Sequence, residues 1–92
     1  MIKSFKHKGV RQFFTTGSVT GIQASHKKRL QQLLGVLDRA KSQRDMALPG
    51  FDLHPLRGNE TGVWSVSVNR NWRLTFEFDD GDAILVDYRD YH

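Results

Sequence analysis

Apolar residues near the start of the chain recur at helical spacing. Val10, Phe13 and Phe14 share one side of a helix, and Gly17 follows them as a typical stop. The pattern predicts one short helix here. The preceding segment, Ile2 to Lys6, is predicted to form a short opening strand.

A second apolar stripe repeats at intervals of three and four residues and comprises Leu30, Leu33, Leu34 and Leu37. This spacing predicts a second, amphipathic helix after a loop that contains Gly21. Ser25 is expected to cap its first turn, because a hydroxyl can accept a hydrogen bond from an unpaired backbone N–H there. The dipeptide Pro49-Gly50 is expected to end the helical half of the chain.

The second half of the chain changes to a period of two, which is typical of half-buried strands. Residues 64–68 alternate Trp or Val with Ser, and residues 72–78 alternate apolar with polar side chains. Residues 69–71 are predicted to form a tight connection, and residues 79–82 contain an Asp-Gly turn signal. A last strand is expected from Ala83 to about Arg89, so the strands form an antiparallel meander.

The predicted architecture is a single α+β domain that spans residues 1–92, with helices first and a mainly antiparallel sheet second. If the large apolar residues of the strands face the helices, the alternate positions line an opposite, open face of the sheet. These positions are Ser65, Ser67, Arg73, Thr75 and Glu77. An open polar face is a candidate platform for a ligand, or an ordinary solvated surface.

Amino-acid composition excludes several kinds of site and indicates where the protein is located. The absence of cysteine excludes disulfides, thiolate metal sites and thiol nucleophiles. Neither a signal peptide nor an apolar run of bilayer length is found, so we expect a soluble, cytoplasmic protein without membrane contact.

Charge is divided unevenly along the chain. Residues 1–44 hold ten of the 14 basic side chains and one acid, so the first half is expected to form a basic face. Lys27, Lys28 and Arg29 lie at the start of the second helix, where cations oppose the helix dipole. This cluster is a candidate contact for an anionic partner such as RNA. Solvated side chains on a helix face are the alternative.

Two segments carry groups suited to proton transfer: residues 52–58, with His54 and Arg57, and the carboxyl end, with Asp90, Tyr91 and His92. Two imidazoles can share acid and base roles near neutral pH. This equipment suffices for RNA transesterification, in which the 2′-hydroxyl of the substrate is the nucleophile. Arg57 and Arg73 have the planar donors that bind phosphate oxygens.

Each signal has a simpler explanation. His54 and Arg57 are also typical of loops and turns, Arg73 could pair with Glu77, and Asp90 could pair with Arg89 or Arg57. A metal site formed by His54, Asp90 and His92 is the other chemical alternative, although neighbouring arginines disfavour a cation. Strict alternation also places Asp90 and His92 on one strand face with Tyr88, and Tyr91 on the other.

The sequence resembles the HigB toxins of the RelE superfamily, which belong to bacterial toxin–antitoxin systems. The resemblance runs from end to end and lies in residues 1–9 (MIKSFKHKG), 53–58 (LHPLRG), 64–68 (WSVSV), 71–73 (NWR) and 90–92 (DYH). It implies two helices packed on one face of an antiparallel sheet. It also implies a ribosome-dependent endoribonuclease that cuts mRNA in the ribosomal A site, and a HigA-like helix-turn-helix antitoxin as partner.

The active-site positions of similar toxins fall on His54, Arg57, Arg73, Asp90, Tyr91 and His92. Similar toxins often have Lys where this chain has Arg57, and arginine does not act as a general base, so Arg57 is assigned to charge stabilisation. His54 is expected to share proton transfer with Asp90 or His92, without a cofactor or metal. A non-catalytic module that binds RNA or antitoxin is the alternative function.

Overall fold

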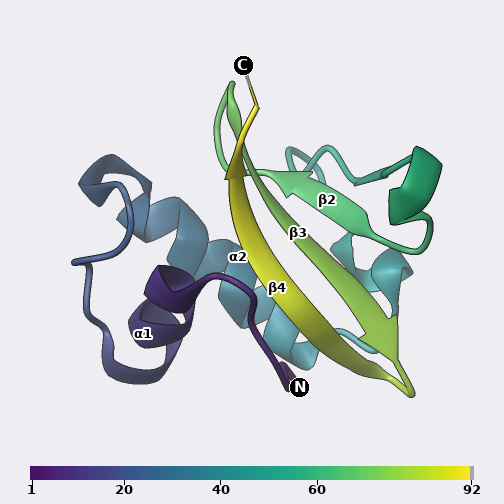
Figure 1. Ribbon diagram of the computed structural model, residues 1–92, viewed down its shortest axis with the longest axis horizontal. Helices are drawn as coiled ribbons and strands as arrows, with labels where there is room; N and C mark the ends of the chain where they lie inside the picture. Colours follow the sequence, from purple (N-terminus) through teal and green to yellow (C-terminus); the bar gives the residue numbers. More distant parts are fainter. Residues whose placement is uncertain (92) are drawn as a thin grey trace.

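Helices and strands are segregated along the chain. In the computed structural model, which describes residues 1–91, two helices precede a four-stranded sheet: α1 (Lys8–Thr16), α2 (Lys27–Arg39), β1 (His54–Pro55), β2 (Trp64–Ser67), β3 (Trp72–Asp79) and β4 (Asp82–Asp90). Neighbouring strands pair antiparallel in the order β1-β2-β3-β4. Figure 1 shows the two helices on one side of the twisted sheet. The predicted α+β architecture is therefore confirmed.

The core lies between the helices and the sheet. The apolar stripe of α2 is fully buried, with Leu30, Leu33, Leu34 and Leu37 all at most 1% exposed. These side chains join buried residues of the strands, which include Val66, Leu74, Phe76 and Val86. The helical and strand periodicities thus meet in one hydrophobic cluster. No helix within residues 1–91 is long and apolar enough to span a bilayer.

Two predicted chain reversals are confirmed. Gly17 ends α1 with a φ of 82°, and its N–H donates to the carbonyl of Phe13. Asp80 and Gly81 join β3 to β4 with φ angles of 52° and 83°, and two successive positive φ values are typical of a tight hairpin turn.

Predictions at the element boundaries need correction. Ser25 is not the helix cap, because it lies within a 3₁₀ turn (Ala24–His26) that leads directly into α2. As predicted, the helical half ends before Pro49-Gly50: α2 ends at Arg39, and a second 3₁₀ turn (Gln43–Met46) precedes Pro49.

The opening segment is not a regular strand. Ile2 and Phe5 form single parallel bridges with Ala83 and Val86 of β4. A bulge divides β3–β4 pairing between Thr75 and Glu77. The amino-terminal segment therefore lines the outer edge of β4 and leaves the sheet mainly antiparallel.

The second face of the sheet is only partly open, in contrast to the prediction: Ser67, Arg73 and Glu77 are half-buried. Ser65 is 1% exposed and Thr75 is fully buried. The segment between Asp52 and Glu60 covers this face, since both of these acids form ion pairs with arginines of the sheet. Arg73 accordingly pairs with Asp52, and not with Glu77 as sequence spacing allowed.

Candidate active site

Two arginines lie side by side on the covered face of the sheet. Arg73 of β3 and Arg89 of β4 are direct cross-strand partners, so their side chains share one face. Adjacent like charges repel, and each is neutralised by an acid from the covering segment. Asp52 pairs with Arg73 at 3.1 Å, and Glu60 pairs with Arg89 at 2.8 Å.

Arg73 is largely committed to protein contacts. Its Nε donates a hydrogen bond to the Ser65 hydroxyl at 2.9 Å. Its Nη1 donates one hydrogen to the Asp52 carboxylate. Its Nη2 donates to the backbone carbonyls of Asp52 and Ser65. A guanidinium has five N–H donors, so one Nη1 hydrogen has no acceptor within residues 1–91.

His54 begins β1 and lies opposite Ser65 of β2. Its Nδ1 is 3.0 Å from the carbonyl oxygen of Asp52 and 3.4 Å from the Asp52 carboxylate, while 62% of the side chain is exposed. A carbonyl oxygen can only accept, so Nδ1 carries the proton in this contact. In the neutral imidazole, Nε2 is then left as the basic atom.

The backbone at Asp52 adopts a rarely used conformation. Its φ is 53°, in the left-handed region that L residues other than Asn and Asp seldom occupy. This turn directs the Asp52 carbonyl to both His54 and Arg73. Local strain of this kind is tolerated where surrounding contacts hold it, and here two side chains do so.

Arg89 links the covering segment to the carboxyl end. Besides Glu60, it contacts Asp87 through Nε at 3.1 Å and the Tyr91 hydroxyl through Nη1 at 3.4 Å. Burial lowers the pKa of Arg89, but the hydrogen bonds to Glu60, Asp87 and Tyr91 outweigh it and raise the pKa above its ordinary value. Arg89 therefore remains a fixed cation at the site.

The end of β4 divides its side chains between the two faces. Asp90 lies opposite Trp72, on the face that also carries Tyr88, whereas the Tyr91 hydroxyl contacts Arg89 on the other face. Burial, and then the charge of Asp90, raise the pKa of Tyr88. The predicted alternation is thus confirmed for Asp90 and Tyr91. His92, and with it the predicted histidine pair and the alternative metal site, lies outside the described residues.

The remaining predicted contact residues differ in their availability. Arg57 is exposed and has no hydrogen-bond or ion-pair partner within residues 1–91. Lys27 and Lys28 are also exposed. Arg29 is partly buried: it donates to the carbonyls of Ser67 and Gly50, and its guanidinium lies 5.1 Å from the centre of the Phe51 ring.

Comparison with known proteins places this arrangement in a family. The model of the RelE-like toxin HigB, of type II toxin–antitoxin systems, matches residues 3–92. The chain belongs to the HigB-like toxin family.

Curated relatives of full length support this membership. The Endoribonuclease HigB of Proteus vulgaris is 42% identical over 92 residues and covers all of both chains. The Toxin HigB-1 of Vibrio cholerae is 35% identical over 94 residues, which include all of this chain and 98% of that protein.

Solved structures share the fold of this HigB-like chain at low identity. The YoeB–YefM complex from Staphylococcus aureus matches with a TM-score of 0.64 and 20% identity over 100% of this chain and 98% of that one. A single-residue mutant of YafQ from Escherichia coli matches with a TM-score of 0.63 and 15% identity over 98% and 93% of the two chains.

The structure adds residues that sequence reasoning did not select for the HigB-like site: Asp52, Glu60, Ser65 and Arg89. Asp52 lies two residues before His54 in the segment that the sequence pattern indicates, but its carbonyl contact depends on the backbone turn. The Glu60–Arg89 pair joins residues far apart in sequence, so no local pattern indicates it.

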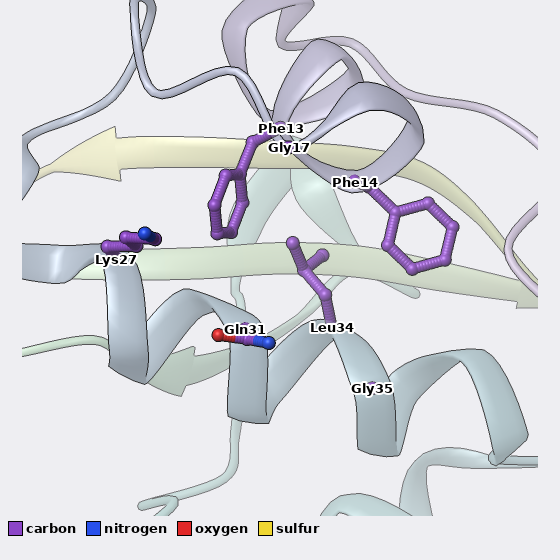
Figure 2. Close-up of a pocket in the computed structure, with 7 residues that line it drawn as sticks. All are labelled: Phe13, Phe14, Gly17, Lys27, Gln31, Leu34 and Gly35. Atoms are coloured by element: carbon purple, nitrogen blue, oxygen red, sulfur yellow. The ribbon is translucent and has the colours of Figure 1, made fainter.

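A separate groove lies between the two helices, away from these polar groups. Figure 2 shows Phe13 and Leu34 directed toward one another from α1 and α2, with Lys27 and Gln31 along the α2 side. Its volume is about 460 Å³. Among the described residues, its lining offers no carboxylate or imidazole, so the groove is not a second candidate for proton-transfer chemistry.

Proposed function

We propose that this HigB-like protein is a toxin that cleaves mRNA in the ribosomal A site, by attack of the 2′-hydroxyl on the adjacent phosphate. Endoribonuclease activity itself follows from family membership and from the full-length similarity to the Proteus endoribonuclease. The observation that carries the chemical proposal is the imidazole of His54, oriented through Nδ1 so that the exposed ring offers Nε2, and joined to Arg73 through the Asp52 carbonyl.

The proposed reaction needs one base and one acid. His54 Nε2 accepts the proton of the 2′-hydroxyl or donates one to the leaving 5′-oxygen, and Asp90 or His92 performs the other transfer. Because Asp90 lies on the face of β4 that carries Tyr88, its use in the same reaction requires the end of β4 to curl toward His54 when RNA is bound. The 2′-oxygen forms a bond to phosphorus as the bond to the 5′-oxygen breaks. The products are a 2′,3′-cyclic phosphate and a 5′-hydroxyl.

Charge that builds up on the phosphate needs cationic donors. Arg57 is exposed and unpaired within residues 1–91, so its whole fork can bind phosphate oxygens. Arg73 supplies its remaining Nη1 hydrogen and its charge, because its other donors hold the segment that carries His54. Tyr91, which is 40% exposed, is assigned to stacking on a nucleotide.

The proposed binding partners of the protein are supported by its charge distribution and by its family. The basic first half, with Lys27, Lys28 and Arg29, is proposed to contact ribosomal RNA or an acidic antitoxin surface. A HigA-like helix-turn-helix antitoxin is the proposed neutralising partner, and the ribosome in the cytoplasm the proposed site of action.

Primer extension on a reporter mRNA in a purified translation system tests the proposal. We expect cuts within codons only on translating ribosomes, and 2′,3′-cyclic phosphate ends on the fragments. Cuts in naked RNA would instead indicate a free ribonuclease. No cleavage by folded protein would favour the non-catalytic binding module.

Two variants address the residue roles. His54→Ala should lose about 100-fold or more in cleavage rate, because one proton transfer is then uncatalysed. An equal loss in His92→Gln assigns the second transfer to His92, whereas a small loss assigns it to Asp90. Asn59→Ala, in the same covering segment, is the matched control and should cut like the parent. Parental rates from folded His54→Ala protein would remove His54 from the mechanism.

A further inference from the structure

One buried imidazole has no part in the proposed reaction. His26, which immediately precedes α2, is 5% exposed and contacts three other parts of the chain. Its Nδ1 is hydrogen-bonded to the Tyr88 hydroxyl of β4, and its Nε2 lies 2.8 Å from Asn69 Nδ2 in the turn between β2 and β3. Its ring also packs edge-on against Trp72, with 5.6 Å between centres.

The hydrogen bonds around Asn69 determine where the His26 proton lies. Asn69 Oδ1 accepts from the backbone N–H groups of Asn71 and Trp72, at 3.0 and 2.9 Å. These two donors fix the orientation of the amide, so Nδ2 is the group directed at His26. An amide nitrogen only donates, hence His26 Nε2 accepts and carries no proton. The neutral imidazole then has its proton on Nδ1 and donates it to Tyr88.

The same turn holds the carboxyl-terminal site residues. The carbonyl of Asn71 accepts a hydrogen bond from the backbone N–H of Tyr91 at 2.6 Å, and Trp72 is the cross-strand partner of Asp90. Tyr88, the other partner of His26, precedes Asp90 by two residues on the same face of β4. His26 therefore touches both strands immediately before the positions from which Asp90 and Tyr91 extend.

We propose that His26 is a positioning residue, whose neutral imidazole joins the β2–β3 turn to β4 and thereby sets the geometry of Asp90 and Tyr91. The proposal rests on the proposed function, because those two residues are assigned to the cleavage reaction there. His26 itself lies behind the sheet from His54 and Arg73, and acts only through Asn69 and Tyr88.

Protonation of His26 is incompatible with this arrangement. A proton on Nε2 would face the Asn69 amide hydrogens, and rotation of the amide would break its two bonds to the turn. Tyr88 is the titratable group that His26 contacts among the described residues. Asp90 of β4 and His7 before α1 act on Tyr88 in turn, and the His7 ring packs on the Tyr88 ring at 5.2 Å. Lys27 follows His26 on its own element.

The test compares three variants in the full chain. His26→Phe keeps an aromatic ring at this position but removes both hydrogen bonds. His26→Gln instead provides a neutral side chain that can both accept and donate a hydrogen bond. Leu34→Val is the matched control: it trims the buried core of α2 without touching the turn. All three are compared by thermal unfolding, ribosome affinity, single-turnover cleavage and amide exchange at Tyr91.

We expect folded His26→Phe to bind ribosomes like the parent, to cleave bound mRNA about tenfold or more slowly, and to exchange the Tyr91 amide faster, because small misplacements of reacting groups cost rate. His26→Gln should recover most of both losses. Cleavage and Tyr91 exchange equal to those of Leu34→Val would overturn the proposal. If the parent does not cut mRNA, the proposed function fails, whereas amide exchange still decides the role of His26.

Discussion

A single backbone carbonyl serves two of the proposed active-site residues. The oxygen of Asp52 accepts hydrogen bonds from His54 Nδ1 and from Arg73 Nη2. The imidazole tautomer and the position of the guanidinium therefore depend on one unusual backbone turn. Residue types alone identified His54 and Arg73 as candidates, but a φ of 53° at Asp52 has no signature in the sequence beyond the tolerance of Asp for that region.

The other arginines show why residue identity does not determine role. The sequence predicts that Arg29 contacts RNA together with Lys27 and Lys28, yet its donors bind two backbone carbonyls and the side chain of Gln32. Arg57, whose position is equally typical of a turn, is exposed. Whether each contacts RNA stays a prediction, and the difference in exposure was decided by tertiary packing that the sequence pattern does not encode.

His26 predicts a dependence of stability on pH. Burial lowers the pKa of His26 below its ordinary value of 6.5. The unfolded chain then binds more protons than the folded one below about pH 6.5, so the free energy of unfolding falls as pH decreases through this value, by about 1.4 kcal/mol per pH unit at most. The contribution of neutral His26 to the free energy of unfolding is fully retained at higher pH.

Urea unfolding of the parent and of His26→Gln between pH 5 and 8 checks this, since the difference between the two curves isolates one group. The two curves should converge toward low pH. Parallel curves over the whole range would contradict the assignment of a neutral, buried imidazole.

At the scale of elements, periodicity predicted most of what the structure contains. Both helices and the three long strands were identified, because their buried stripes form the core that holds them. The errors lie in segments without a repeating pattern: the cap of α2, the bridges of the opening segment, and the cover over the second sheet face. That cover depends on the pairs Asp52–Arg73 and Glu60–Arg89, which join distant parts of the chain.

One helix–loop contact depends on two glycines. Gly9 of α1 lies so close to Gly21 that a Cβ on Gly9 would overlap the Gly21 carbonyl. Gly9→Ala should therefore lower the free energy of unfolding by about 1–3 kcal/mol, as other overpacked sites do. Gly35 of α2 is the matched control, because no atom of the described residues outside its own helix turn lies within 4 Å of its Cβ position.

Gly35→Ala should raise stability by about 0.5–1 kcal/mol, since alanine is the better helix former. Chemical denaturation of the two single variants gives both values. Equal effects of the two substitutions would show that α1 does not approach the Gly21 loop as described.

On the scale of the whole molecule, charge and chemistry are separated along the sequence. The proposed reacting groups belong to the acidic second half, and the exposed Lys27 and Lys28 to the basic first half. This division matches a protein in which affinity for a polyanion and cleavage are carried by different residues.

Replacing Lys27 and Lys28 with Gln should weaken ribosome binding and flatten its dependence on salt, because fewer counterions are released. Single-turnover cleavage of bound mRNA should change little. Ribosome affinity measured across a salt series checks the effect. The control is the double variant Lys3→Gln, Lys41→Gln, which removes the same number of positive charges. An affinity and salt slope equal to those of the control would count against a specific contact.

The bridges between the opening segment and β4 bear on how the chain is made. Ile2 and Phe5 pair with Ala83 and Val86, about 81 positions away in the sequence. During synthesis these contacts must wait until residue 86 has left the ribosome, and Asp90 and Tyr91 emerge later still. A nascent chain therefore cannot complete its proposed cleavage site until nearly all of the described residues are outside the ribosome that makes it.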